Sequence, residues 1–172
     1  MKLKLLTLTS ALLVSCQVNA NENSEVITEW FINSQGVAIS PLTEEGYMGM
    51  SYVYMTVNTE SDPEFEIYYK MHLVFLSKNP CDNKAPYELT WETGDQLVNY
   101  LYMGCENASH GFAKRRFIPV SKNGKDYLMS LFITNDTDPD PDGLKVGMYR
   151  YSAKGFQQTF LDAIDRSTKT VL

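Results

Sequence analysis

The stretch FEIYYKMHLVFLS, residues 65–77, indicates the fold of this chain most clearly. Apolar and aromatic residues occupy alternate positions, and polar residues occupy several of the positions between them. The apolar set consists of Phe65, Ile67, Tyr69, Met71, Leu73 and Phe75, and the polar set of Glu66, Lys70 and His72. Because successive side chains of a strand point to opposite faces, this period of two predicts a β-strand with one face on a hydrophobic core.

Segments rich in β-branched and aromatic residues recur along the chain and predict further strands. They cover 25–33, 47–58, 87–91, 96–105, 115–120 and 144–151. The segments 87–91 and 96–105 flank ETGD, whose glycine is typical of a hairpin turn. Many strands joined by turns predict a mostly β fold with an antiparallel, sandwich-like sheet.

Residues 121–136, SKNGKDYLMSLFITND, fit two structures. Asn123 and Gly124 favour a hairpin turn. Ser121 as a cap before an apolar face favours a short amphipathic helix instead. That face would consist of Tyr127, Leu128, Leu131 and Phe132. We predict the helix.

The segment SAKGFQQTFLDAIDRS, residues 152–167, predicts a C-terminal α-helix capped by Ser152. Its apolar residues recur at helical spacing and are Phe156, Phe160, Ala163 and Ile164. A stripe of this kind packs one face of a helix onto a sheet. A helix that binds a partner is the alternative interpretation.

The first residues, MKLKLLTLTSALLVSCQVNA, are typical of a bacterial secretory signal. Lys2 and Lys4 precede an apolar run over 5–14. This run is far shorter than the roughly 20 residues that span a bilayer. Cleavage after a signal peptide of residues 1–20 would leave one exported β-rich domain, 21–172.

Cys16 offers a second cleavage site. The residues Leu-Val-Ser-Cys at 13–16 resemble the lipobox of bacterial lipoproteins, which would make 1–15 a lipoprotein signal and Cys16 the lipid-bearing first residue. Both cleavages predict a protein of the periplasm or outer membrane. The lipid would be its only expected link to a membrane.

Acidic residues outnumber basic ones, 21 Asp and Glu against 15 Lys and Arg, for a net charge of −6. Residues 1–20 contain two lysines and no acidic residue, so the net charge without them is −8. A chain of this charge repels phosphate backbones, and we therefore expect no nucleic-acid partner.

Cys81 and Cys105 are the cysteines that follow the leader. Two cysteines in an oxidising compartment most simply form one disulfide. A catalytic thiol or a metal-binding pair is the alternative, but no C-x-x-C spacing is present, and His72 and His110 lie in other parts of the sequence.

The sequence NDTDPDPDG, residues 135–143, contains alternating carboxylates followed by a glycine. The candidate calcium ligands are Asp136, Asp138, Asp140 and Asp142. Oxygen ligands at every second position are typical of the first half of a calcium loop. The second half is missing, because Tyr149 stands where an EF-hand has its glutamate. A solvated acidic turn is the alternative interpretation, and we expect no other cofactor.

Motifs for nucleophilic or metal-dependent catalysis are absent from the sequence. His72 falls on the polar face of its strand, where solvation is expected, and His110 falls in a loop. The pair Glu44–Glu45 is expected to be surface charge. A hydrolase site made of two carboxylates that the fold brings together stays open.

The C-terminal third contains a series of short motifs in a characteristic order. They are GC at 104–105, GKDYLMSLF, KVGMYRY and SAKGFQQTFLDAI. Over roughly residues 104–164 the chain resembles the invasion-associated locus B family and similar small exported Gram-negative proteins. The resemblance implies a secreted or periplasmic β-sandwich-like domain without catalytic residues. It also implies a disulfide at Cys105 and a role for Gly155-Phe156 in seating the helix.

These observations together predict a non-enzymatic binding protein of the cell envelope. Its partner would be a protein, as for an immunity or exclusion protein or an accessory of invasion. The net negative charge favours a basic partner. The alternatives are a hydrolase that acts on envelope polymers through carboxylates and a structural module that depends on calcium.

Overall fold

The computed structural model describes residues 27–44, 49–58, 68–82, 84–137 and 143–169. Its strands are β1 (Phe31–Ile32), β2 (Ala38–Ile39), β3 (Thr43–Glu44), β4 (Met50–Asn58), β5 (Tyr68–Ser77), β6 (Tyr87–Thr93), β7 (Gln96–Asn107), β8 (Ala113–Pro119), β9 (Leu144–Val146) and β10 (Tyr149–Tyr151). Its helices are the short 3-10 helix η1 (Ser109–Gly111), α1 (Lys122–Thr137) and α2 (Phe156–Lys169).

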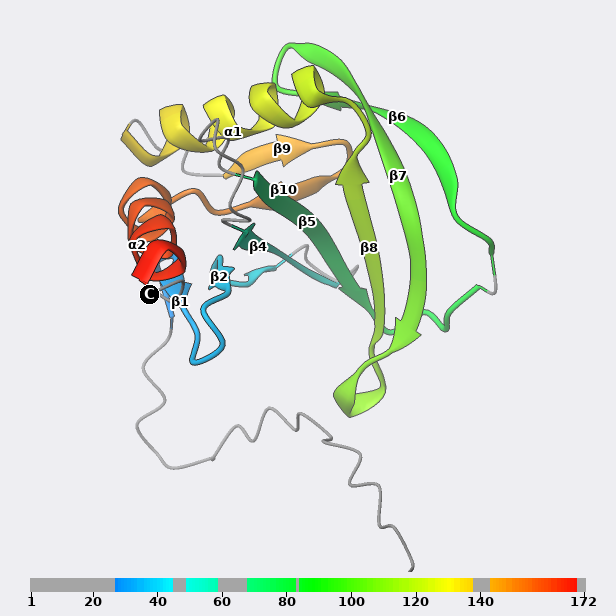
Figure 1. Cartoon of the computed structure of the whole chain (residues 1–172). Coiled ribbons are helices and arrows are strands. Elements are labelled where there is room, and N and C mark those ends of the chain that lie inside the picture. Colours follow the sequence, from blue (N-terminus) through cyan, green and yellow to red (C-terminus); the bar gives the residue numbers. More distant parts are fainter. Residues whose placement is uncertain (1–26, 45–48, 59–67, 83, 138–142, 170–172) are drawn as a thin grey trace, which may run out of the picture.

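The ten strands form one antiparallel sheet in the order β1–β2–β4–β5–β8–β7–β6–β9–β10, with β3 paired to β4. The sheet curls strongly (Figure 1). The Ser51 hydroxyl of β4 donates a hydrogen bond to the backbone carbonyl of Arg150 in β10, although the two strands stand far apart in this order. The mostly β, antiparallel fold with a C-terminal helix is confirmed, and its layers arise because one sheet folds over itself.

The concave side of the curled sheet contains the core. On β5, the alternate residues Met71, Leu73 and Phe75 are all buried, as the period of two predicts. Aromatic side chains fill the centre, where Phe117 of β8 lies 4.6 Å from Trp91 and 5.3 Å from Tyr102, measured between ring centroids.

The two helices close one end of the curled sheet (Figure 1). Trp30, which precedes β1, joins them, because its ring packs edge-on against Phe132 of α1 at 5.6 Å and Phe156 of α2 at 4.9 Å. The indole Nε1 also donates a 2.7 Å hydrogen bond to the Ser152 carbonyl. The predicted helix over 121–136 is confirmed as α1, and its face with Leu128 and Phe132 is buried.

The start of α2 differs from the prediction. The helix begins at Phe156 rather than directly after Ser152, so Ser152 as its cap was wrong. Asp136 takes that role: its Oδ1 accepts a 2.6 Å hydrogen bond from the Gly155 N–H, and its Oδ2 accepts a 2.8 Å bond from the Gln157 N–H. An acceptor from a neighbouring helix therefore satisfies N–H groups that a local cap usually satisfies.

Gly155 and Phe156 seat α2 as expected. Gly155 has a φ of +78°, and a Cβ there would lie 3.2 Å from the Glu29 Cβ and 3.4 Å from the Trp30 nitrogen. Phe156 is fully buried. Only glycine combines this backbone conformation with such a close approach of the Trp30 segment.

Two strand predictions were too long. Within 25–33, of which residues 27–33 are described, only Phe31–Ile32 pair as β1. The expected strand over 144–151 is two strands, β9 and β10, joined by a turn at Gly147. Gly147 has a φ of +61°, and a Cβ there would lie 2.8 Å from the Trp91 Cγ. The turn requires glycine here, because φ is positive and the indole of Trp91 occupies the space that a side chain would need.

Cys81 and Cys105 form the predicted disulfide, with their Cα atoms 5.4 Å apart. It links the segment after β5 to β7 and thus joins the two strands that flank β8. Closing a loop of 24 residues stabilises the fold by about 3–4 kcal/mol in the chain-entropy picture. Arg115 supports the same end, because it donates hydrogen bonds of 2.7 Å to the Ser77 hydroxyl and 2.8 Å to the Pro80 carbonyl.

Candidate functional site

The side of the sheet that faces away from the core carries a group of aromatic and basic residues on β4, β5 and β8. We name it the outward face and define it as Tyr52, Tyr54, His72, Lys114 and Arg116. These strands are neighbours in the sheet, in the order β4–β5–β8. Every second residue of a strand points to the same side, so strand pairing alone brings these five residues together.

The register places the members of the outward face directly beside one another. Tyr54 pairs with His72, and Val74 pairs with Tyr52 on one side and with Arg116 on the other. Val74 is fully buried although it points away from the core, so the outward face has an apolar floor. Aromatic rings and long basic side chains flank Val74. Side chains of these kinds can cover apolar surface with their carbon atoms.

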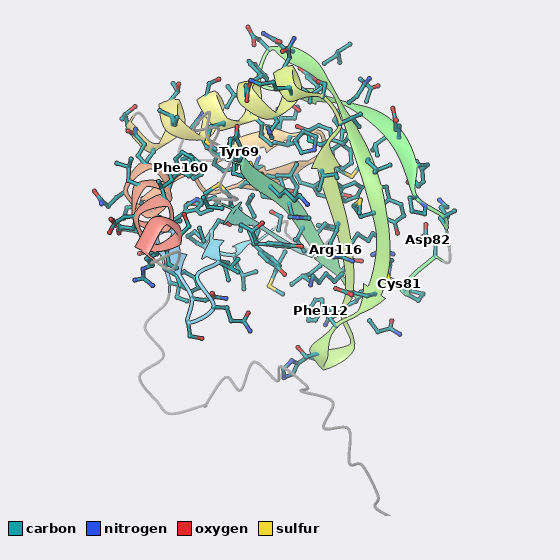
Figure 2. The ribbon with its side chains drawn as sticks, viewed as in Figure 1. Tyr69, Cys81, Asp82, Phe112, Arg116 and Phe160 are labelled. Carbon is teal, nitrogen blue, oxygen red and sulfur yellow. A yellow bond between two sulfur atoms is a disulfide. The ribbon has the colours of Figure 1, made fainter. Side chains whose placement is uncertain are left out.

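Side-chain contacts fix this arrangement. The Tyr54 ring stacks on the His72 imidazole with 4.4 Å between centroids and 7° between planes. Arg116, labelled on β8 in Figure 2, forms a side-chain hydrogen bond with Tyr54 that raises the pKa of its guanidinium. The Lys114 Nζ atom donates a 2.9 Å hydrogen bond to Oε1 of Glu106 on β7. This bond holds the pKa of Glu106 below its usual range.

His72 is half-buried rather than fully solvated, which corrects the sequence-based expectation. Burial lowers its pKa, and the positive charges of Arg116, Lys70 and Lys114 lower it further. The imidazole is therefore neutral at pH 7. Its Nδ1 atom is buried without a hydrogen-bond partner among the described residues.

Two carboxyl groups of the described residues, Asp82 and Asp126, have pKa values shifted away from what a general acid needs. A general acid of a hydrolase usually has a raised pKa. Hydrogen bonds lower the pKa of Asp82, where Lys84 is the main cause, and of Asp126, where Lys122 is. Among residues 27–44, 49–58, 68–82, 84–137 and 143–169, no group of three or more His, Cys, Asp and Glu side chains forms a metal site.

The other candidate residues lie apart from the outward face. His110 is exposed in η1 and has a φ of +58°. Asp136 engages both carboxylate oxygens at the start of α2. Asp138, Asp140 and Asp142 lie outside the described residues, as do residues 1–20 with Cys16, so the calcium loop and the lipid anchor stay predictions.

Sequence reasoning missed the outward face as a site, although parts of the pattern were visible. Tyr52 and Tyr54 alternate along one strand, and Lys114 and Arg116 alternate along another. The two pairs of residues come together because β8 pairs with β5 in the sheet. In the chain, the β6–β7 hairpin separates β5 from β8. No local pattern encodes this pairing.

Comparisons of the chain with protein-family models, with curated proteins and with solved structures find no match. The resemblance of residues 104–164 to the invasion-associated locus B family therefore stays a prediction. Among the residues that the structure describes, no helix has both the length and the apolar character needed to cross a membrane.

Proposed function

We propose that this chain is a non-enzymatic binding protein of the bacterial cell envelope that holds a protein partner on its outward face. The observation that carries the proposal is the gathering of tyrosine, histidine and basic side chains on three adjacent strands of an acidic chain. Tyrosine and arginine are the residue types that dominate the energetic centres of protein interfaces.

Prior ordering of the outward face supports binding. The stack of Tyr54 on His72 and the hydrogen bond between Tyr54 and Arg116 hold these side chains in place before any partner arrives. These side chains then lose less conformational entropy when a partner binds. The disulfide between Cys81 and Cys105 supports export, because such bonds persist mainly in oxidising compartments.

The charge of the outward face favours an acidic partner. Net charge alone had favoured a basic one, but this surface carries Lys114 and Arg116 with Lys70 beside them. Glu106 pairs with Lys114, which leaves the charges of Arg116 and Lys70 in excess. Attraction between oppositely charged surfaces speeds the association of two proteins, and salt weakens this attraction by screening it. An acidic surface or segment of the partner protein therefore fits the outward face best.

The hydrolase alternative has less support. The lowered pKa values of Asp82, Glu106 and Asp126 favour carboxylates that stay ionised over a carboxylic acid that donates a proton. An ordered surface of tyrosines and basic residues suits recognition without chemistry.

Site-specific photo-crosslinking in the envelope of the producing bacterium tests this function. We expect Tyr54→p-benzoylphenylalanine to give one covalent adduct with an acidic protein. The matched control is Thr90→p-benzoylphenylalanine, because Thr90 is exposed on the same side of the sheet but on β6, two strands beyond β8. The function is wrong if position 54 gives no adduct, or if both positions give the same adducts.

A further inference from the structure

A cleft of about 700 Å³ opens at the start of β5, beside the ends of β4 and β8 and the start of α1. Its basic lining residues are Lys70, Lys122 and Lys125, and its apolar ones include Ile118, Pro119 and Val120. This volume is typical of sites for small molecules, which fall in the range of roughly 300–1,000 Å³. Among the five residues of the outward face, His72 is the one that also lines the cleft.

Lys70 and Lys125 carry the positive charge of the cleft. Lys70 is exposed and has no carboxylate within ion-pair distance among the residues that the structure describes. The Lys125 ammonium lies 4.8 Å from the centroid of the Tyr69 ring in a cation–π contact. It forms no ion pair among the residues that the structure describes, although its charge acts on nearby Asp126. The cleft thus offers two ammonium groups to an anion.

Among the described residues, Asp126 is a carboxylate near these cations, and it is already engaged. Asp126 accepts a 2.8 Å hydrogen bond from Lys122 and a 3.3 Å hydrogen bond from the Tyr69 hydroxyl. Tyr69, labelled in Figure 2, also packs edge-on against Phe160 of α2 at 5.8 Å. The wall that carries Lys125 is therefore held by contacts with both helices.

The first turn of α1 adds to the positive potential. Ser121 and Lys122 line the cleft at the amino end of this 16-residue helix, whose first turn contains no acidic residue. The Ser121 hydroxyl accepts a 3.0 Å hydrogen bond from the Gly124 N–H. The positive end of a helix dipole favours anions, and here it reinforces the two ammonium groups.

We propose that the cleft binds a small organic anion that carries a carboxylate or phosphate group on an apolar body. The ammonium groups of Lys70 and Lys125 hold the anionic group. The apolar side chains of Ile118, Pro119 and Val120, which also line the cleft, take the body. The cleft and the outward face share His72 and lie next to each other, but Lys114 and Arg116 of the outward face do not line the cleft.

Titration of the ¹⁵N-labelled, disulfide-bonded protein with three probes tests the proposal by two-dimensional NMR. The probes are hexyl phosphate, hexanoate and inorganic phosphate at low ionic strength. We expect saturable shifts of the Thr56, Lys70 and Ser121 amide signals with at least one hexyl compound, and weaker binding of inorganic phosphate. The hexyl compound that binds more tightly identifies the anionic group.

The double variant Lys70→Gln/Lys125→Gln should bind that probe at least about tenfold more weakly, as loss of charge-assisted contacts implies. The control Lys78→Gln/Lys145→Gln removes the same charge from two exposed lysines outside the cleft and should bind as the parent does. Absence of saturable shifts, equal losses in both double variants, or inorganic phosphate that binds as tightly as the hexyl compounds would overturn the proposal. The crosslink from position 54 does not decide it.

Discussion

Phe117 and Arg116 are neighbours on β8 but face opposite sides of the sheet. Phe117 is 4 % exposed and packs among Trp91, Tyr102 and Tyr149. Arg116 is half-buried, and its contacts are polar ones with Tyr54 and with the charges around it. The inward side chain has the contacts that folding requires, whereas the outward one leaves its positive charge available at the surface. The difference separates a side chain that the core requires from one to which the proposed function assigns recognition.

The largest expected difference is between Phe117→Ala and Arg116→Ala. Removing the buried ring should lower the free energy of unfolding by about 3–5 kcal/mol, because it leaves a cavity. Removing the half-buried side chain of Arg116 should lower the free energy of unfolding by about 1 kcal/mol or less. Urea denaturation of both disulfide-bonded variants measures this, and equal losses would break the comparison.

The second prediction concerns the covalent link between the strands that flank β8. Cys81→Ser/Cys105→Ser should lower the free energy of unfolding by about 3 kcal/mol, since a loop is no longer closed in the unfolded chain. The outward face should survive in the folded fraction, because its contacts do not involve either cysteine. Denaturation measures the loss in free energy of unfolding. NMR contacts between the rings of Tyr54 and His72 show whether the outward face survives.

Asp136 belongs with the residues that serve folding. Asp136→Ala should lower the free energy of unfolding by about 1–2 kcal/mol, because it leaves N–H groups at the start of α2 without an acceptor. Asp162→Ala, on the exposed side of α2, is the matched control and should change little. Thermal melting with calcium and with chelator tests the other interpretation: a rise in melting temperature with calcium that Asp136→Ala abolishes would reassign this carboxylate to a metal site.

The smallest expected effect is a pH dependence from His72. Its folded pKa is lower than 6.5, so below pH 6.5 the unfolded chain binds more protons than the folded one. Stability should therefore fall as the pH drops through this range toward the folded pKa, and His72→Gln should remove part of that slope. His110→Gln, which changes an exposed histidine, should leave it unchanged. A slope that His72→Gln leaves intact would contradict the burial of this imidazole.

Local patterns in the sequence account for most of the elements. Alternation in β5, the turn between β6 and β7 and the apolar face of α1 each depend on residues close together in the chain, and each is confirmed. Predictions that depend on distant contacts were less complete. The need for glycine at position 147 depends on Trp91, and the start of α2 depends on Asp136 and Trp30. The outward face depends on the pairing of β5 with β8, which follows from the global topology.

The central claim is that the outward face serves binding rather than folding, and one paired measurement on Lys114→Gln tests it most directly. We measure the free energy of unfolding and the yield of the position-54 crosslink on the same preparation. The account predicts a stability within about 1 kcal/mol of the parent, as for other surface ion pairs, together with a loss of most of the crosslink. A crosslink that persists at full yield, or one lost only because the variant unfolds, would contradict it.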